Sequence, residues 1–384
     1  MVVKSIRWGI LGTGKICQDF ASAVGATDGA ELYGVAARDF TKAQDFAKNF
    51  NVTHAYESYE ALAESDVDVV YVGTWHTLHE AHVMLCFSKG KNVVVEKPMA
   101  VNAAQARRMV AAARRRGLFL MEAHWTRFMP AVKEAVRAVE ANEIGEIVAV
   151  LSDFGYLFGG EKAHMNQFRP EMAGGALLEI GCYPISAAFH FLSSVSGLGP
   201  PVTVVASGTT ELGVDVSAGV VLKFPRGRVA TLGYSYLGEL PEQTTIIGSR
   251  GRIVLHNPGH CPTKVSIVTL AGQRNEYQTE TKEYPLPKLE GTLNCPNSEG
   301  LVYECAAVGN LLRAGKKESD VVPLDESVHM AEVMDSVRHQ VGVVYPADGL
   351  LSRMSAGRPW LQPTALGIFL LLTGAAAGAV LKRR

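Results

Sequence analysis

Short apolar runs alternate with helical patterns in the first third of the chain, and this alternation limits the fold more than any other feature. The apolar runs are rich in β-branched residues, as expected for strands buried on both faces of a sheet. Strands that alternate with helices in this way predict a parallel, doubly wound α/β sheet. The expected strands cover residues 5–11, 31–37, 68–73, 91–96 and 118–122, and the expected helices begin near residues 15, 41, 78 and 102.

A glycine-rich turn joins the first expected strand to the first expected helix. Gly12 and Gly14 lie in this turn, and Cys17 takes the third small position of the pattern. Gly12 allows a tight turn, Gly14 lets the backbone approach a pyrophosphate, and a small residue at position 17 lets the helix pack closely on the strand. The helix N-terminus would bind the pyrophosphate through its unpaired N–H groups. We therefore expect a dinucleotide-binding Rossmann domain over residues 1–123.

The end of the second expected strand indicates which dinucleotide binds. NAD-specific sites place an Asp or Glu there to hold the ribose 2′-hydroxyl. In this chain the first polar residue is Arg38, followed by Asp39. A guanidinium suits a 2′-phosphate, so the sequence favours NADP. The alternative is a surface arginine paired with Asp39.

A carboxylate, an ammonium and a proline follow the buried run Val93–Val95, as Glu96, Lys97 and Pro98. Proline cannot continue a central strand, so the chain must turn there. Open parallel sheets bind ligands at this carboxyl edge. Position alone makes Lys97 either a solvated lysine or a functional one.

Three histidines, at positions 76, 79 and 82, follow the strand at residues 68–73. Their spacing is compatible with a metal site, but no cysteine or carboxylate set completes a tetrahedral site. We therefore predict no metal. His76 and His79 are either site residues at the sheet edge or ordinary residues of the turn into the next helix.

The alternation of expected strands and helices ends after Glu122. Strand candidates then follow one another with few helices between them, which predicts an α+β domain with an open, mainly antiparallel sheet over residues 124–346. The exception is residues 174–194, an apolar helical stretch that carries Glu179, Tyr183 and His190. These are either a catalytic set or two half-buried rings with a surface carboxylate.

The overall composition excludes two classes of protein. Lys and Arg total 37 against 38 Asp and Glu, a formal net charge of −1, so we expect no nucleic-acid partner. The six cysteines include no C-x-x-C pair, which indicates reduced thiols in a reducing compartment rather than a disulfide framework or a zinc site.

The C-terminal residues differ from the rest. After an expected linker at residues 347–363, residues 364–384 include seventeen uncharged residues, 365–381, before a basic end. As a helix they would span about 25 Å, slightly less than a typical hydrocarbon core. We expect a C-terminal transmembrane anchor that holds a cytoplasmic-facing enzyme on an unidentified membrane. The alternative is a buried terminal helix.

Several motifs together resemble those of the Gfo/Idh/MocA oxidoreductase family. They are G-I-L-G-T-G-K-I at 9–16, A-A-R-D at 36–39, G-T-W-H-T-L-H at 73–79, E-K-P at 96–98, M-E-A-H-W-T-R-F at 121–128 and G-G-A-L-L-E-I-G-C-Y at 174–183. Within the family, the chain is similar to the dimeric trans-1,2-dihydrobenzene-1,2-diol dehydrogenases, also described as NADP-dependent D-xylose 1-dehydrogenases. N-P-G-H-C-P-T at 257–263 and Y-P-L-P at 284–287 fit that branch. The resemblance covers about residues 5–346 and leaves out the hydrophobic tail.

The resemblance implies the following site. Lys97 would lie between nicotinamide and substrate, Pro98 would be a cis-proline, and Tyr183 would occupy the acid/base position. The outer face of the second sheet would form a homodimer interface. One departure is Glu179, where the family usually has Asp. The implied cofactor-binding residues are Gly9, Gly12, Gly14, Lys15, Ile16, Arg38, Thr74, His76, Glu96 and Lys97.

Tyrosine is a poor base at neutral pH, but a neighbouring ammonium lowers its pKa. We therefore expect Tyr183 to act as the base and Lys97 as its electrostatic partner and proton relay. Glu179 and His79 would orient them. A wall formed by Trp125, Arg127, Phe128 and Tyr183 would bind a ring-shaped diol or a pyranose. The expected reaction converts a trans-dihydrodiol to a catechol, or D-xylose to its lactone. The alternatives are a membrane-tethered, non-catalytic NADP sensor and a relative that acts on another sugar or polyol.

Overall fold

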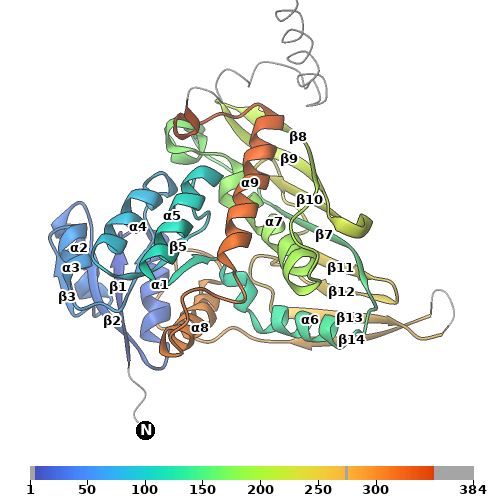
Figure 1. The fold of residues 1–384 in the computed structure, drawn as a ribbon, viewed down its shortest axis with the longest axis horizontal. Helices are drawn as coiled ribbons and strands as arrows, with labels where there is room; N and C mark the ends of the chain where they lie inside the picture. Colours follow the sequence, from blue (N-terminus) through green and yellow to red (C-terminus); the bar gives the residue numbers. More distant parts are fainter. Residues whose placement is uncertain (1–4, 273–275, 350–384) are drawn as a thin grey trace, which may run out of the picture.

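The structure is a computed structural model that describes residues 5–272 and 276–349. Its two sheets lie side by side and belong to different parts of the chain (Figure 1). The expected linker beyond residue 349 and the expected C-terminal helix lie outside the described residues.

The first sheet is the predicted parallel, doubly wound one. Its strand order is β3-β2-β1-β4-β5-β6, and each neighbouring pair is parallel. The order reverses between β1 and β4, so a crevice opens at their carboxyl ends. The strands are β1 (Ile6–Leu11), β2 (Ala30–Ala36), β3 (His54–Tyr56), β4 (Val69–Val72), β5 (Asn92–Glu96) and β6 (Leu120–Ala123).

Helices cover both faces of this sheet. Asn102 caps α5 by accepting a hydrogen bond from the Gln105 backbone N–H, and Gly117 ends the helix in the left-handed conformation. Asn and Gly are the favoured residue types at these two cap positions. The helices are α1 (Lys15–Gly25), α2 (Phe40–Asn49), α3 (Tyr59–Glu64), α4 (His79–Ser88) and α5 (Ala103–Arg116).

The second sheet has eight strands in the order β14-β13-β12-β11-β7-β10-β9-β8. All neighbours are antiparallel except β7 and β10, which are parallel. The predicted open, mainly antiparallel sheet is therefore confirmed. Its strands are β7 (Ile147–Gly155), β8 (Thr203–Glu211), β9 (Val214–Lys223), β10 (Val229–Ser235), β11 (Thr244–Gly248), β12 (Gly251–Leu255), β13 (Lys264–Leu270) and β14 (Tyr277–Glu283).

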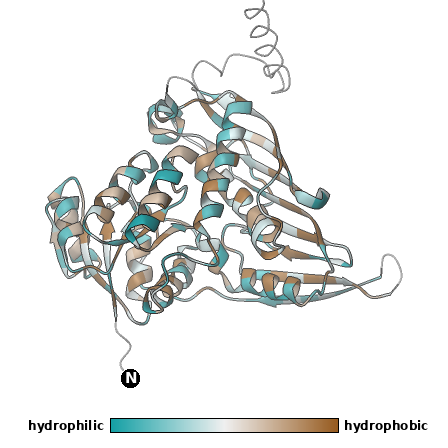
Figure 2. Cartoon of the chain, viewed as in Figure 1, coloured by the Kyte–Doolittle hydropathy of each residue, from teal (hydrophilic) through white to brown (hydrophobic). Residues whose placement is uncertain are grey.

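Among the described residues, helices pack on one face of this sheet only (Figure 1). α6 (Pro130–Glu140) contacts β13, α7 (Cys182–Ala188) contacts β7, and α9 (Leu324–Val341) contacts both β8 and α5. α8 (Leu301–Arg313) packs against α1 of the first domain. Apolar residues gather along the strands and on the helix faces that meet them (Figure 2).

The helical stretch at residues 174–194 forms, but it is not one regular α-helix. A π-helical turn at Leu177–Gly181 leads into α7, and a second one at Phe189–Val195 follows it. Pro184 lies inside this stretch and lacks the N–H that a regular helix needs. The wider Pro170–Val195 segment is apolar and long enough to span a membrane, but 83% of its most apolar window is buried inside the protein. It is therefore a core segment of the second domain.

Candidate active site

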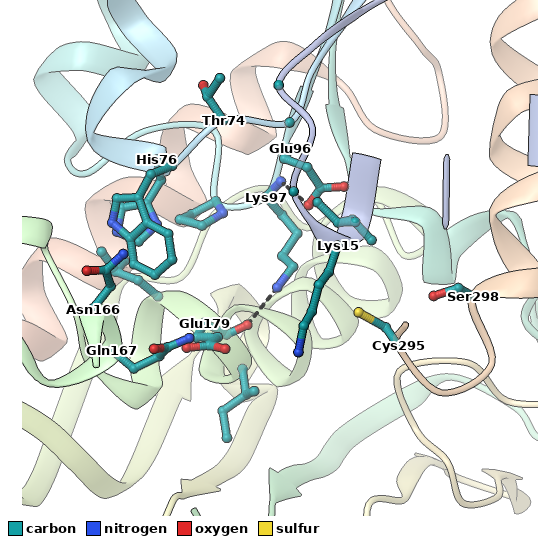
Figure 3. Close-up of a pocket in the computed structure, with 18 of the residues that line it drawn as sticks. Lys15, Thr74, His76, Glu96, Lys97, Asn166, Gln167, Glu179, Cys295 and Ser298 are labelled. Atoms are coloured by element: carbon teal, nitrogen blue, oxygen red, sulfur yellow. Dashed lines mark hydrogen bonds between the residues drawn. The ribbon is translucent and has the colours of Figure 1, made fainter. Parts of the chain in front are cut away.

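A cavity of about 1300 Å³ opens between the two domains. On the Rossmann side it is lined from the carboxyl ends of β1, β2, β4 and β5, and on the other side by residues of β7, the π-helical turn and the segment at 295–298. Lys15 and Lys97 both extend from the Rossmann side toward the second domain (Figure 3). The cavity is the place where a cofactor and a substrate can meet.

The glycine turn forms one end of the cavity. Gly12 has φ +109°, and a Cβ there would lie 3.2 Å from the Gly73 carbonyl oxygen and 3.3 Å from the Cys17 sulfur. A Cβ on Gly14 would meet nothing within 4 Å, so its backbone borders open space. α1 begins directly after it, without an acidic residue in its first turn. This cradle fits the pyrophosphate of a dinucleotide.

Cys17 holds α1 against the end of β4. Its Sγ donates a hydrogen bond to the Gly73 carbonyl oxygen at 3.2 Å. Burial raises the pKa of this thiol to about 12, so it stays protonated. It serves as the small packing residue that the sequence predicted.

Arg38 lines the cavity together with Lys42 and Tyr59. The Asp39 carboxylate instead caps α2 by accepting a hydrogen bond from the Thr41 backbone N–H at 3.0 Å. Among the described residues, no carboxylate lies within ion-pair distance of Arg38. Its guanidinium is therefore available to an anionic ligand, and the alternative of an Arg38–Asp39 pair finds no support in the contacts.

Lys97 follows the last residue of β5, and its bond to Pro98 is cis, as expected. Its Nζ donates a hydrogen bond to the Glu179 carbonyl oxygen at 2.8 Å (Figure 3) and lies 4.8 Å from the centre of the Tyr183 ring. Burial opposes the charge on Lys97, but the facing Tyr183, Cys182 and Glu96 raise its pKa overall. Lys97 is therefore an ammonium held against the face of a phenol.

Glu96 hydrogen-bonds to the backbone of this lysine. Its buried carboxylate accepts hydrogen bonds from the Tyr71 hydroxyl at 2.5 Å and from the Lys97 backbone N–H at 3.1 Å. Burial raises the pKa of Glu96, and the Lys97 charge lowers it less strongly. The side chain thus fixes the strand end rather than the substrate.

The Tyr183 hydroxyl oxygen accepts a hydrogen bond from the Trp125 indole N–H at 3.1 Å. Burial raises the pKa of Tyr183, while the Lys97 charge and the indole bond lower it; the effect of burial is the larger. Both opposing contacts favour the phenolate. They are the groups that make Tyr183 a better base than its burial alone would allow.

Glu179 and His79 contact this pair through other atoms. The Glu179 carboxylate accepts a hydrogen bond from the Tyr236 hydroxyl at 2.6 Å, so it is the backbone carbonyl that holds Lys97. His79 Nε2 lies 2.8 Å from the Thr74 carbonyl oxygen, and Nδ1 lies 3.0 Å from that of Pro98. Burial lowers the pKa of His79 to about 4. His79 is thus placed to position the ends of β4 and β5.

The loop after β4 reaches the second domain. His76 Nε2 lies 2.8 Å from the Ala173 carbonyl oxygen, and Trp75 Nε1 donates to that of Met172 at 2.5 Å. Burial lowers the pKa of His76 to about 3, so the ring is neutral. Thr74 hydrogen-bonds to His82 at 2.9 Å. These contacts hold one edge of the cavity together across the domain boundary.

Three of the predicted site residues do not line the cavity. Arg127 is buried and pairs with Glu326 at 2.5 Å, and its Nε donates to the Ser186 hydroxyl. Phe128 is 2% exposed and packs in the core. A Cβ on Gly9 would meet the Val67 side chain at 3.1 Å, well away from the glycine turn.

These three residues therefore lie outside the cavity, and the contacts lend no support to their predicted site role. Trp125–Phe128 forms a short 3₁₀ turn, and of its members only Trp125 reaches the cavity. Gly9 is small so that α3 can pack on the sheet. The residue types alone predict neither arrangement.

The structure also adds residues that the sequence did not single out. The cavity is lined by Ile16, as expected, and further by Phe154, Tyr156, Asn166, Gln167, Glu239, Glu242, His260 and residues 295–298. The last segment is tied to α1, because the Asp19 carboxylate accepts hydrogen bonds from the backbone N–H groups of Asn294 and Cys295, each at 2.8 Å. Only His260 had a signal, since it lies in the N-P-G-H-C-P-T motif.

Comparison with known proteins agrees with this architecture. Residues 6–124 match the family described as an oxidoreductase family with an NAD-binding Rossmann fold, and residues 132–254 match the GFO/IDH/MocA C-terminal domain. The chain is 39% identical over 350 residues to trans-1,2-dihydrobenzene-1,2-diol dehydrogenase of Sus scrofa, covering 90% of this chain and 99% of that protein. The Homo sapiens enzyme of the same name is 39% identical over 349 residues, with the same coverage.

Two solved structures share this fold. A 3-ketoreductase from Actinomadura kijaniata, in complex with NADP and TDP-benzene, superposes with a TM-score of 0.72 and 25% identity, covering 89% of this chain and 99% of that one. Levoglucosan dehydrogenase in complex with NADH and levoglucosan has a TM-score of 0.75 at 17% identity, covering 88% and 97%, and shows the fold alone.

The fold and the cavity define a dehydrogenase that uses a nicotinamide dinucleotide. The chain belongs to the Gfo/Idh/MocA oxidoreductase family.

Proposed function

We propose that this oxidoreductase uses NADP to oxidise a vicinal diol or a cyclic sugar. The two reactions in view are trans-1,2-dihydrobenzene-1,2-diol to catechol and D-xylose to D-xylonolactone. The identity to dihydrodiol dehydrogenases supports the first. The observation that carries the proposal is the Lys97 ammonium, 4.8 Å from the centre of the Tyr183 ring, in the same cavity as the glycine turn.

Bound NADP supplies the hydride acceptor, carbon 4 of its nicotinamide. Gly12, Gly14, Lys15 and Ile16 surround the end of the cavity where its pyrophosphate would lie. Arg38, which has no carboxylate partner in the part of the chain that the structure describes, would hold the 2′-phosphate by a bidentate contact. Lys42 lines the same part of the cavity and adds a second positive charge.

Tyr183 takes the proton of the substrate hydroxyl that is oxidised. The indole N–H of Trp125 occupies one lone pair of the Tyr183 oxygen, and this hydrogen bond strengthens as negative charge develops there. Lys97 stabilises the same charge from the ring face. In the reverse direction, Lys97 polarises the carbonyl and Tyr183 returns the proton.

The neutral His79 and the Glu179 backbone carbonyl keep Lys97 in place. His79 lies between the carbonyl oxygens of Thr74 and Pro98, and as a neutral imidazole it donates its single N–H to one of them. A base must lie within hydrogen-bond reach of the proton it takes, so a small displacement of Lys97 or Tyr183 has a large effect on rate. We assign His79 and Glu179 to positioning.

We further propose that the chain forms a homodimer through the uncovered face of the second sheet. Leu151 on β7, Val221 on β9 and Val205 on β8 lie in register across this face, with Thr231 of β10 between the first two, and they are 43%, 41% and 55% exposed. Apolar side chains gathered on one face in this way favour a protein partner. A two-fold dimer buries this same surface patch on both copies of the chain.

We also propose that the hydrophobic run at residues 365–381 holds the enzyme on a membrane. Recovery of the full-length protein with membranes after carbonate washing, and its release only by detergent, is the expected result. Recovery in the wash would contradict the anchor and leave the enzymatic proposal intact.

The enzymatic proposal is tested by NADPH formation from the two substrates and a panel of other cyclic polyols, with NADP and NAD compared. We expect turnover of at least one of the two substrates, with NADP preferred. Turnover of a different polyol alone would assign another substrate to the same mechanism. No turnover of any panel member would refute the proposal and favour the sensor.

A further inference from the structure

His260 sits in an aromatic wall next to the proposed base. Its ring stacks on Phe154, with centres 5.0 Å apart and planes 9° apart. The ring centres of Tyr183 and Trp125 each lie 6.0 Å from that of His260. The Thr126 hydroxyl donates a hydrogen bond to the His260 backbone carbonyl. The imidazole is therefore fixed on the substrate side of the cavity.

Glu242 lies beside this imidazole. Its Oε1 is 3.4 Å from His260 Nδ1, and its Oε2 accepts a hydrogen bond from the Asn257 side-chain amide at 3.4 Å. The Glu242 backbone N–H donates to the Asp153 carboxylate at 2.6 Å. Both side chains are largely buried, at 14% exposed for His260 and 12% for Glu242, and both line the cavity.

The contacts of this pair are incomplete. His260 Nδ1 is buried and has no hydrogen bond within the described part of the chain, because the 3.4 Å approach of Glu242 lacks hydrogen-bond geometry. The Asn257 bond to Glu242 is long. Buried polar groups in native structures are normally satisfied, so this pair has hydrogen-bonding capacity left for a ligand.

Glu242 also adopts a costly backbone conformation. Its φ is +51°, in the left-handed region that residues with a Cβ seldom occupy. Such residues persist when the surrounding structure holds them, and they gather at ligand sites. Here the Asp153 hydrogen bond holds the backbone and aims the Glu242 side chain at His260 and the cavity.

Lys97, Tyr183, His260 and Glu242 form a chain of contacts in this order. Lys97 Nζ lies 4.8 Å from the centre of the Tyr183 ring, that ring centre lies 6.0 Å from the centre of His260, and His260 Nδ1 lies 3.4 Å from Glu242 Oε1. A hydroxyl bound here is therefore not the one whose proton Tyr183 takes. A carboxylate accepts hydrogen bonds from hydroxyl groups, and an imidazole can donate or accept one.

We propose that Glu242 and His260 bind a non-reacting hydroxyl group of the substrate, and that this contact makes the site favour an aldopyranose over a dihydrodiol. An aldopyranose carries hydroxyls beyond a single vicinal pair, whereas the dihydrodiol offers carbon–hydrogen bonds at those ring positions. A site built to bind a hydroxyl discriminates strongly against an analogue without it, since its polar groups are then left unpaired. This inference rests on the proposed function and names the substrate class of the same site.

Two variants test the pair. Glu242→Gln removes the charge and keeps the size, and His260→Phe removes the ring nitrogens and keeps the stack on Phe154. The matched control is Glu283→Gln, which changes an exposed carboxylate of β14 that pairs with Lys264. Thermal unfolding of each variant establishes that it is folded.

The measurement is kcat/KM for D-xylose and for trans-1,2-dihydrobenzene-1,2-diol with NADP. A lost hydrogen bond to a charged group corresponds to about tenfold or more in affinity. We expect Glu242→Gln and His260→Phe to lower kcat/KM for D-xylose about tenfold more than for the dihydrodiol. KM should carry most of the effect, because a non-reacting hydroxyl is bound equally in ground and transition states. Equal losses with both substrates would overturn the inference.

A binding measurement separates this inference from the proposed function. Calorimetric titration of the NADP-bound enzyme with D-xylose should show weaker binding to both variants than to the wild type and the Glu283→Gln control. Wild-type enzyme that binds D-xylose but oxidises no member of the polyol panel would refute the proposed function alone. D-xylose binding that is absent from the wild type, or unchanged in the variants, would overturn the role of Glu242 and His260.

Discussion

The charge on Lys97 should control the pH dependence of the reaction through Tyr183. Burial raises the pKa of Tyr183, and the Lys97 ammonium is the strongest group that lowers it. The ammonium lies 4.8 Å from the ring centre. Two unit charges about 5 Å apart interact by about 3 kcal/mol at an effective dielectric constant of about 20. This corresponds to a pKa difference of about 2.

Lys97→Met should therefore raise the pKa of Tyr183 by about two pH units and lower kcat/KM at neutral pH by about 100-fold. The assay is NADPH formation from D-xylose or the dihydrodiol over a range of pH. In the wild type, kcat/KM rises with pH as Tyr183 deprotonates. In Lys97→Met the same rise should occur at higher pH, and in Tyr183→Phe it should be absent.

A second variant separates the two roles open to Lys97. Lys97→Arg keeps the positive charge but cannot give up its proton. If Lys97 acts through its charge, Lys97→Arg should retain much more activity than Lys97→Met. If Lys97 itself moves the proton, both variants should lose activity equally. A Lys97→Met enzyme with the wild-type pH profile would refute the electrostatic role altogether.

Three further predictions concern the cofactor, stability and assembly. Arg38→Ala should raise KM for NADP about tenfold or more beyond its effect on KM for NAD, because the variant lacks the guanidinium for the 2′-phosphate; equal increases would refute that contact. Burial raises the pKa of Asp215, which accepts a hydrogen bond from the Leu177 backbone N–H, from 3.8 to about 6. Its ionised form therefore destabilises the fold above about pH 6, and this penalty vanishes below about pH 4. In urea unfolding, Asp215→Asn should raise the free energy of unfolding by up to about 3 kcal/mol at pH 7 and leave it unchanged at pH 4. The same gain at both pH values would contradict this. Val221→Arg on the uncovered sheet face should convert a dimer into a monomer in light scattering, and an unchanged mass would place the interface elsewhere.

The parallel sheet could be predicted from the sequence because its strands are buried on both faces and read as continuous apolar runs. β3 and α3 were not expected, since three and six residues carry too little periodicity. The regular helix expected around Tyr183 is interrupted by π-helical turns. Pro184 gave the only local signal for that irregularity.

The site could be predicted where a residue follows a strand directly. Lys97 and the glycine turn are of this kind, because the carboxyl edge of a parallel sheet is fixed by the topology. Arg127 shows the limit of this reasoning. It belongs to the same motif as Trp125, but the turn directs its side chain to Glu326 in the core. Glu242 and His260 come together only through tertiary packing, so no local pattern predicts their contact.

The most direct test of the central claim is the transfer of deuterium from substrate to cofactor. D-xylose deuterated at carbon 1 is incubated with the wild-type enzyme and NADP, and the NADPH is analysed by mass spectrometry. We predict NADPH that carries one deuterium, and a strong loss of this product in both Tyr183→Phe and Lys97→Met. The ring-deuterated dihydrodiol serves as the parallel substrate. Unlabelled NADPH from both substrates, or undiminished labelling in the two variants, would contradict hydride transfer at this site.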